Sequence, residues 1–299
     1  TLGVDNSPRY PKETFEDTED YTVYTSEYGV TMKQWKNANS TPQFLHHTIV
    51  DYDSWLKAKE RMTPADDRID WAWLDKNYKR IRDEGQWVNA MLWFGFDVTH
   101  SWVVGTERVL MAIVEEPEWL MDMFDHMLNL SLNLYDRMWD AGYTFDSVFW
   151  CDDMGYKQNQ FFSLNTYREF LKPYHQRAID WAHHKGIKAH MHSCGDVNPF
   201  VPELVSMGLD ALNPLEVKAG MDPVALKQKF GDRLILHGGI NALLYEDEEA
   251  ICAEAKRILP IMKEHGGYIF STDHSVPSVV SLEEFGRIVE IAKEYGKYD

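Results

Sequence analysis

KAHMHSCGD, residues 188–196, joins a short apolar strand directly to a polar turn, and this arrangement recurs along the chain. The other short runs of this kind each precede polar residues, and stretches with helical periodicity lie between them. The six expected strands are 87–96, 147–151, 188–192, 211–215, 234–237 and 268–271. Strands that alternate with helices predict βαβ units and a parallel sheet. No Gly-x-Gly-x-x-Gly follows a strand, so the pattern favours an α/β barrel over a dinucleotide-binding sheet.

The expected fold is a (β/α)8 TIM barrel in which the first two strands are missing from this chain. A length of 299 residues fits one barrel with an extension. Residues 1–50 differ from the rest, because YTVYT (21–25) and VTM (30–32) flank a Gly turn and predict a β-hairpin. We therefore expect an N-terminal hairpin extension at 1–50 and a barrel with six of eight strands at 51–299.

Composition excludes several classes of protein. Hydrophobic residues make up 44% of the chain and charged residues 26%, which excludes disorder. The net charge of −18 argues against nucleic acid or an anionic membrane as partner. No apolar run has the roughly 18 residues that a membrane span needs. Three Cys are too few for a disulfide framework and favour a reducing compartment, so we expect a cytoplasmic protein that binds a small molecule.

The candidate site residues are the polar groups at the carboxyl ends of the strands, where βα barrels hold their active sites. Every expected strand ends in such groups: Asp97; Cys151, Asp152 and Asp153; His192 and Cys194; Asn213 and Glu216; His237; Asp273 and His274. This arrangement predicts an enzyme, because a purely structural barrel has no need of polar groups at every strand end.

His192 and Cys194 form the sharpest unit. Residues i and i+2 of a strand point the same way, so an imidazole and a thiol would face one spot. These groups are zinc ligands, and a catalytic zinc has three protein ligands and one open position. His274 is the expected third ligand, and the Asp152–Asp153 pair is another source of ligands. The alternative is a buried structural Cys194 beside a hydrogen-bonded core His192.

The acidic residues have two readings. Paired carboxylates can separate their pKa values for acid–base work, whereas the alternative is one capping Asp and one solvated Asp. We favour Asp153 as the inward-facing member of its pair, with Asp152 as the alternative. Asp273 is a candidate general acid–base, or an Asp that orients His274. His237, before two glycines, is expected to line the pocket, as is the aromatic Trp150, although such aromatics are more often core.

Several of these motifs together resemble the uroporphyrinogen decarboxylase superfamily over roughly residues 85–299. They are FLKPY (170–174), HSCGD (192–196), LNP (212–214), HGGIN (237–241) and GGYIF (266–270). The resemblance implies a (β/α)8 barrel, which agrees with the strand pattern. It also implies one of two activities.

True decarboxylases of this superfamily act on a tetrapyrrole without a cofactor, using an Asp and arginines near the N-terminus. Its corrinoid methyltransferases carry His-x-Cys on a strand as zinc ligands, with a further ligand near the last strand. His192 and Cys194 match the methyltransferases, whereas His274 stands where many of them have Cys. None of the six strand ends carries Arg or Lys, which favours a less charged substrate than a polycarboxylate.

The leading prediction is therefore a zinc-dependent methyltransferase that moves a methyl group between a corrinoid and a small substrate. The resemblance implies a corrinoid protein as partner and a homodimer. The predicted site comprises metal ligands His192, Cys194 and His274, catalytic Asp153 and Asp273, and substrate-binding Asp97, Asn213, His237 and Trp150. The alternatives are a uroporphyrinogen decarboxylase and a non-catalytic family member that binds a corrinoid or tetrapyrrole.

Overall fold

A computed structural model describes residues 1–37 and 41–298, which form two compact units. The first unit comprises Thr1–Trp150 with Arg168–His175, and the second comprises Cys151–Tyr167 with Gln176–Asp299.

The elements of the first unit follow the chain in this order: β1 (Glu13–Asp17), β2 (Tyr21–Thr25), β3 (Val30–Trp35), β4 (Gln43–His47), α1 (Tyr52–Arg61), η1 (Asp66–Arg68), α2 (Trp71–Asp83), β5 (Asn89–Met91), η2 (Val98–Val103), α3 (Thr106–Glu115), α4 (Pro117–Asp140) and β6 (Ser147–Cys151). Helices α5 (Leu164–Phe170) and α6 (Lys172–His184) fall across the division of the chain. The elements of the second unit are β7 (Gly155–Tyr156), β8 (Asn159–Gln160), β9 (Lys188–His192), α7 (Val201–Ser206), β10 (Ala211–Asn213), η3 (Val217–Ala219), α8 (Pro223–Phe230), β11 (Ile235–His237), η4 (Ala242–Glu246), α9 (Glu248–Met262), β12 (Tyr268–Ile269) and α10 (Leu282–Tyr295).

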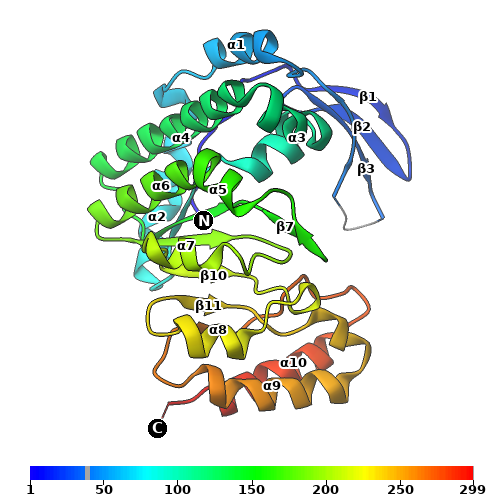
Figure 1. The fold of residues 1–299 in the computed structure, drawn as a ribbon, viewed down its shortest axis with the longest axis vertical. Coiled ribbons are helices and arrows are strands. Elements are labelled where there is room, and N and C mark those ends of the chain that lie inside the picture. The colour runs from blue at the N-terminus through cyan, green and yellow to red at the C-terminus, as the bar shows by residue number, and fades with distance from the viewer. Residues whose placement is uncertain (38–40, 299) are drawn as a thin grey trace. The chain divides into compact units, whose positions relative to one another are not determined.

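The first unit begins with an antiparallel sheet in the order β1-β2-β3-β4, drawn in blue in Figure 1. Strands β2 and β3 form the hairpin expected from the sequence, and its turn contains Gly29 at φ 76°. A Cβ there would lie 2.8 Å from a ring carbon of Tyr10, so the turn requires glycine. The boundary of this extension at residue 50 stays a prediction.

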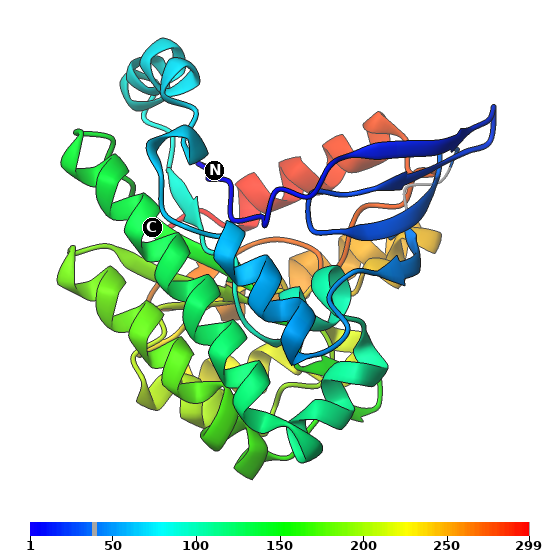
Figure 2. The same cartoon turned by 90° about the horizontal axis from the view of Figure 1, so that it is seen from above.

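A parallel pair and a long helix form the rest of the first unit. Strand β5 pairs with β6 in parallel, and Leu2 adds a parallel bridge to Ala90 on β5. Residues near the N-terminus thus contribute to the parallel sheet, although no strand was expected there. Helix α4 buries its apolar stripe and lies beside α1 (Figure 2). The Trp55 indole of α1 donates a 2.7 Å hydrogen bond to Asp122 on α4.

The second unit contains four parallel strands in the order β12-β11-β10-β9. All four lie within the ranges expected from the sequence, as do β5 and β6. The register places Asn213 beside His192 and Leu212 beside Leu236. Because the strands are parallel, their carboxyl ends meet at one edge, which is where their polar residues gather.

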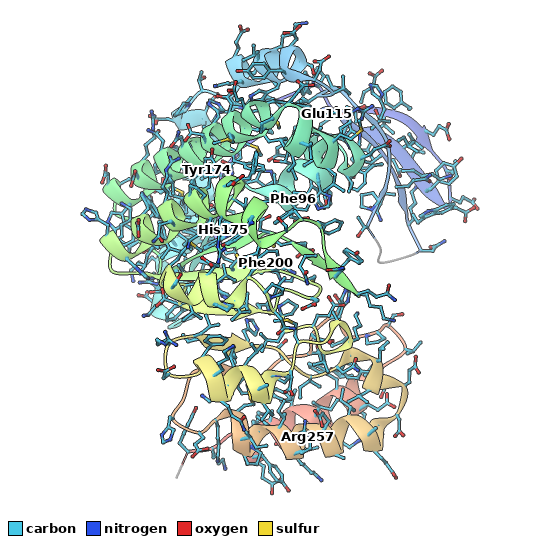
Figure 3. All side chains as sticks on the ribbon, viewed as in Figure 1. Phe96, Glu115, Tyr174, His175, Phe200 and Arg257 are labelled. Carbon is cyan, nitrogen blue, oxygen red and sulfur yellow. The ribbon has the colours of Figure 1, made fainter. Side chains whose placement is uncertain are left out.

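Helices cover this sheet and position the segments that follow its strands. Helices α9 and α10 pack side by side, and α8 contacts both α9 and β11 (Figure 1). Phe200, labelled in Figure 3, is fully buried and packs on Tyr167 with 5.0 Å between ring centroids. This contact anchors the segment that runs from β9 to α7. In the described part of the chain, no helix is both long and apolar enough to span a membrane.

Asp210 fixes the opposite, amino-terminal edge of the sheet. Its carboxylate accepts a 2.9 Å hydrogen bond from the Ala189 N–H and lies 2.7 Å from His183 Nε2 and 2.8 Å from Lys188 Nζ. Burial alone would raise the pKa of Asp210, but these partners lower it below its ordinary value of 3.8. A carboxylate whose folded-state pKa is lowered stabilises the fold above its unfolded-state pKa, and this contribution is lost as pH falls.

We therefore expect Asp210→Asn to lower the free energy of unfolding by about 1–2 kcal/mol at pH 7, since the exposed Lys188 pair adds little. The difference should shrink as pH falls below 4 and vanish below the folded-state pKa. Urea unfolding from pH 7 to pH 3 measures it, with the exposed Asp232→Asn as control. A difference that is constant across this range would contradict the assignment.

Candidate metal centre

Asp153, His192 and Cys194 form a cluster at the carboxyl edge of the second unit's sheet. One ligand atom from each residue lies within 4.8 Å of the other two. Among residues 1–37 and 41–298, no other group of three His, Cys, Asp or Glu side chains has its ligand atoms this close together. His192 Nε2 lies 3.2 Å from Cys194 Sγ and 3.7 Å from Asp153 Oδ1. His192 ends β9, and the alternation of a strand carries Cys194 to the same side. Asp153 is the second residue after the end of β6 and is the member of the Asp152–Asp153 pair that reaches this cluster.

Asn213 sets the orientation of the imidazole. Its Oδ1 lies 2.5 Å from His192 Nδ1, and its Nδ2 donates to the His237 carbonyl at 3.4 Å. Because the amide nitrogen has its own acceptor, the Asn213 oxygen faces the ring and Nδ1 carries the hydrogen. Nε2 then presents a lone pair to Cys194 and Asp153, as a metal-binding imidazole does.

Two carboxylates hold the turn that carries Cys194. The Cys194 N–H donates to Asp153 Oδ1 at 2.7 Å, and the Gly195 N–H donates to Glu216 Oε2 at 2.6 Å. Glu216 is buried and lies 3.4 Å from Lys218. Gly195 has φ 80°, and a Cβ there would lie 2.1 Å from the carbonyl carbon of Gly155. The backbone of the turn that carries the thiol is therefore tightly held.

The electrostatics of the cluster favour a bound cation. Burial raises the pKa of the Cys194 thiol well above its usual range, and the carboxylates of Asp153 and Glu216 raise it further. Burial also raises the pKa of Asp153, and His192 opposes this only in part. Without a cation the thiol stays protonated at neutral pH. A divalent cation would stabilise the thiolate and carboxylate together.

A second pair of imidazoles lies farther back along the strands. His237 Nδ1 lies 3.4 Å from His190 Nε2. Burial lowers the pKa of His190 to about 4, with help from His237 and His192, and burial likewise lowers the pKa of His237. Both rings are therefore neutral at pH 7. His190 had no predicted role, although its position two residues before His192 on the same strand indicates that both face the same side.

A cavity of about 380 Å³ opens over the cluster, and we name it the metal cavity. Its lining residues are Asp153, His192, Cys194, Asn213, Pro214, Ser271, Thr272, Asp273, His274 and Ser275. Within the described part of the chain, this lining includes neither Lys nor Arg. The cavity therefore suits a substrate of low negative charge.

His274 and Asp273 lie at this cavity in different ways. The predicted ligand His274 lines it but is exposed and stands outside the cluster, where Asp153 supplies the third nearby donor. Asp273 is fully buried, and its oxygens accept from the Val217 N–H at 2.9 Å and the Ala242 N–H at 2.8 Å. These contacts hold three loops together. The metal role of His274 and the catalytic role of Asp273 stay predictions.

The remaining predicted substrate-binding residues lie elsewhere. His237 is on β11 against His190, and it is absent from the lining of the metal cavity as far as the structure describes the chain. Asp97 and Trp150 belong to the first unit. Asp97 accepts a 3.0 Å hydrogen bond from Ser101, and Trp150 is fully buried beside His175, which Figure 3 labels. Trp150 therefore packs as a core side chain, and its contact with substrate stays a prediction.

Asn213→Ala is expected to weaken zinc binding by about 10–100-fold, because His192 loses the acceptor that fixes its ring and tautomer. Competition with a chromophoric chelator measures the affinity. Asn77→Ala, on α2 and outside the cluster, serves as control. Equal affinity in the Asn213 variant and the wild type would show that the amide does not orient the ligand.

Comparison with known proteins identifies the family. The model of the family described as Uroporphyrinogen decarboxylase (URO-D) matches residues 98–295, about two thirds of the chain. The chain belongs to the uroporphyrinogen decarboxylase family. The fold of this family is a (β/α)8 barrel, and the parallel strands β6 and β9–β12 lie within the matched residues.

Two known proteins are similar to this chain, one in sequence and one in fold. A uroporphyrinogen decarboxylase from Alcanivorax borkumensis is 35% identical over 69 residues, which are 23% of this chain and 20% of that protein. The match thus spans about a fifth of the relative's length. The structure of a methyltransferase from Methanosarcina mazei aligns with a TM-score of 0.66 and 20% identity over 90% of this chain and 77% of that one. This likeness supports the shared fold.

Proposed function

We propose that this family member is a zinc-dependent methyltransferase that moves a methyl group between a corrinoid, carried by a partner protein, and a small substrate. The observation that carries the proposal is the cluster of Asp153, His192 and Cys194, in which Asn213 turns the imidazole lone pair toward the thiol. The likeness in fold to a methyltransferase supports it.

The donor set fits zinc. An imidazole nitrogen, a thiolate and a carboxylate are the protein ligands that zinc takes, and three of them leave one position open to substrate. His192, Cys194 and Asp153 would hold the ion at the floor of the metal cavity. When bound, zinc lowers the pKa of a thiol or hydroxyl group that joins it, which creates a nucleophile at neutral pH.

The surrounding residues orient the metal ligands and hold the loops around them. Asn213 accepts from the His192 Nδ1–H and so directs Nε2 toward the ion, and the neutral His190 and His237 add no competing positive charge. Asp153, whose pKa is raised by burial, can bind the ion or hold a proton from the entering substrate. Asp273 and Glu216 hold the loops around the cavity in place.

Methylcobalamin and a panel of small thiols test this function. We expect the zinc-loaded protein to transfer the methyl group to a thiol and leave reduced cobalamin, which absorbance and product mass both report. Chelator-treated protein should lose the activity and recover it with zinc. Equal rates in the treated and reloaded protein would contradict a metal-dependent transfer.

A cofactor-free decarboxylase is the second candidate, and the similarity to the Alcanivorax enzyme favours it. A tetrapyrrole with many carboxylates needs cationic groups, which the metal cavity lacks among its described lining. Carboxylate loss from uroporphyrinogen by chelator-treated protein would support this candidate, and carbon dioxide release measures it.

A further inference from the structure

A second cavity lies in the same unit, between α10 and the segment that follows β12. Its volume is about 500 Å³. Apolar side chains form most of its walls, among them Phe270, Phe285, Val289 and Ala292. We name it the apolar cavity.

The two cavities adjoin. Ser271 and Thr272 line both of them. This shared wall is fixed, because Thr272 forms a parallel bridge with Ile240 and its hydroxyl donates to the His274 carbonyl at 2.7 Å. The buried Asp273 follows directly and is held by the Val217 and Ala242 amides. A molecule that occupies both cavities would contact Ser271 and Thr272.

The lining defines the chemistry of an occupant. Within the described residues, Lys293 is the charged group of the apolar cavity, and its ammonium already lies 2.8 Å from Glu290 on the same helix. Val276 and Phe285 keep 40% and 39% of their surface exposed, so an apolar group placed there would remove apolar surface from water. A volume near 500 Å³ with few polar groups is typical of a small-molecule site.

We propose that the apolar cavity binds the non-reacting body of the substrate, while the reacting heteroatom lies in the metal cavity. The substrate class is then a small uncharged molecule with an aryl or branched alkyl group next to a thiol or hydroxyl. This inference rests on the proposed function for the role of the metal cavity. The apolar cavity itself stands on its own geometry.

Fluorine NMR of the full chain with 4-fluorotoluene tests the cavity alone. We expect saturable binding to the wild type and at least tenfold weaker binding to Ala292→Phe, which fills the cavity. Val289→Phe is a second filling variant in case the first fails to fold. Glu294→Phe, exposed on the same helix, is the matched control and should bind as the wild type does. No binding to the wild type, or equal binding to the folded filling variants, overturns the proposal.

The link to the metal is tested with 4-fluorothiophenol and the zinc-loaded protein, with zinc content measured on the same samples. We expect this thiol to bind at least tenfold more tightly than 4-fluorotoluene when zinc is present, and the filling variants to weaken it. If the thiol binds through zinc with equal affinity in the wild type and the filling variants, the substrate proposal is wrong and the proposed function stands. If the protein takes up no zinc while the filling variants still lose 4-fluorotoluene, the proposed function fails and the apolar site stands.

Discussion

Cys194→Ser is expected to lower the zinc affinity of the protein by more than about a hundredfold, a larger loss than a change in an outer partner of a metal ligand causes. The serine hydroxyl keeps the position of the thiol but holds its proton far more tightly, so it supplies no anionic ligand at neutral pH. His192 and Asp153 would remain as two donors, 3.7 Å apart.

Because the pKa of the Cys194 thiol is raised, we expect the zinc affinity of the protein to depend on pH. Zinc binds the thiolate, so the thiol must release its proton as the ion enters. Because the free thiol is protonated throughout pH 6–8, the apparent zinc affinity of the wild type should rise by up to about tenfold for each pH unit. Cys194→Ser should lose this contribution.

Chelator competition at several pH values measures both effects. Cys252→Ser, on α9 and outside the cluster, is the control and should bind zinc as the wild type does. Equal zinc affinity in the Cys194 and Cys252 variants would remove the thiol from the ligand set.

Gly195→Ala is expected to lower the free energy of unfolding by about 3–5 kcal/mol and to abolish stoichiometric zinc binding. The added Cβ would lie 2.1 Å from the Gly155 carbonyl carbon and 2.3 Å from the Tyr156 nitrogen. Both are backbone atoms, so relief requires the β7 segment or the Cys194 turn to move. The φ of 80° adds strain for any residue with a side chain.

Gly186→Ala separates these two causes. Gly186 has a similar φ of 73°, but a Cβ there would meet nothing within 4 Å. Its replacement should therefore cost only about 1–2 kcal/mol and leave zinc binding unchanged. Urea unfolding of both variants measures the difference, and equal losses would show that the close approach to Gly155 does not hold the turn.

The sequence predicted the parts of this fold that depend on local pattern. Short apolar runs with polar ends located the parallel strands of the second unit, and strand alternation brought His192 and Cys194 to one side. The four-stranded extension was only partly visible. Strand β1, ETFED, is exposed at every residue, so it carries no apolar alternation that marks a strand.

The rest of the site depends on contacts between distant residues. Asn213 contacts His192 Nδ1 because of the register in which β9 and β10 pair. The sequence of neither strand alone indicates this register. The Gly195 N–H donates a hydrogen bond to Glu216, which lies 21 positions farther along the chain, so the sequence did not indicate that Glu216 holds the turn. Asp153 lies beside the two predicted ligands because its carboxylate accepts from the Cys194 N–H, a contact between residues 41 positions apart, whereas the metal role of His274 stays a prediction.

X-ray absorption at the zinc edge of the purified full chain reports which atoms surround the bound ion. We expect zinc with one sulfur neighbour at about 2.3 Å and nitrogen or oxygen neighbours at about 2.0–2.2 Å. We also expect Cys194→Ser to lose the sulfur neighbour. Protein without zinc after exposure to the ion, or zinc surrounded only by oxygen and nitrogen in the wild type, would contradict a metal centre at His192, Cys194 and Asp153.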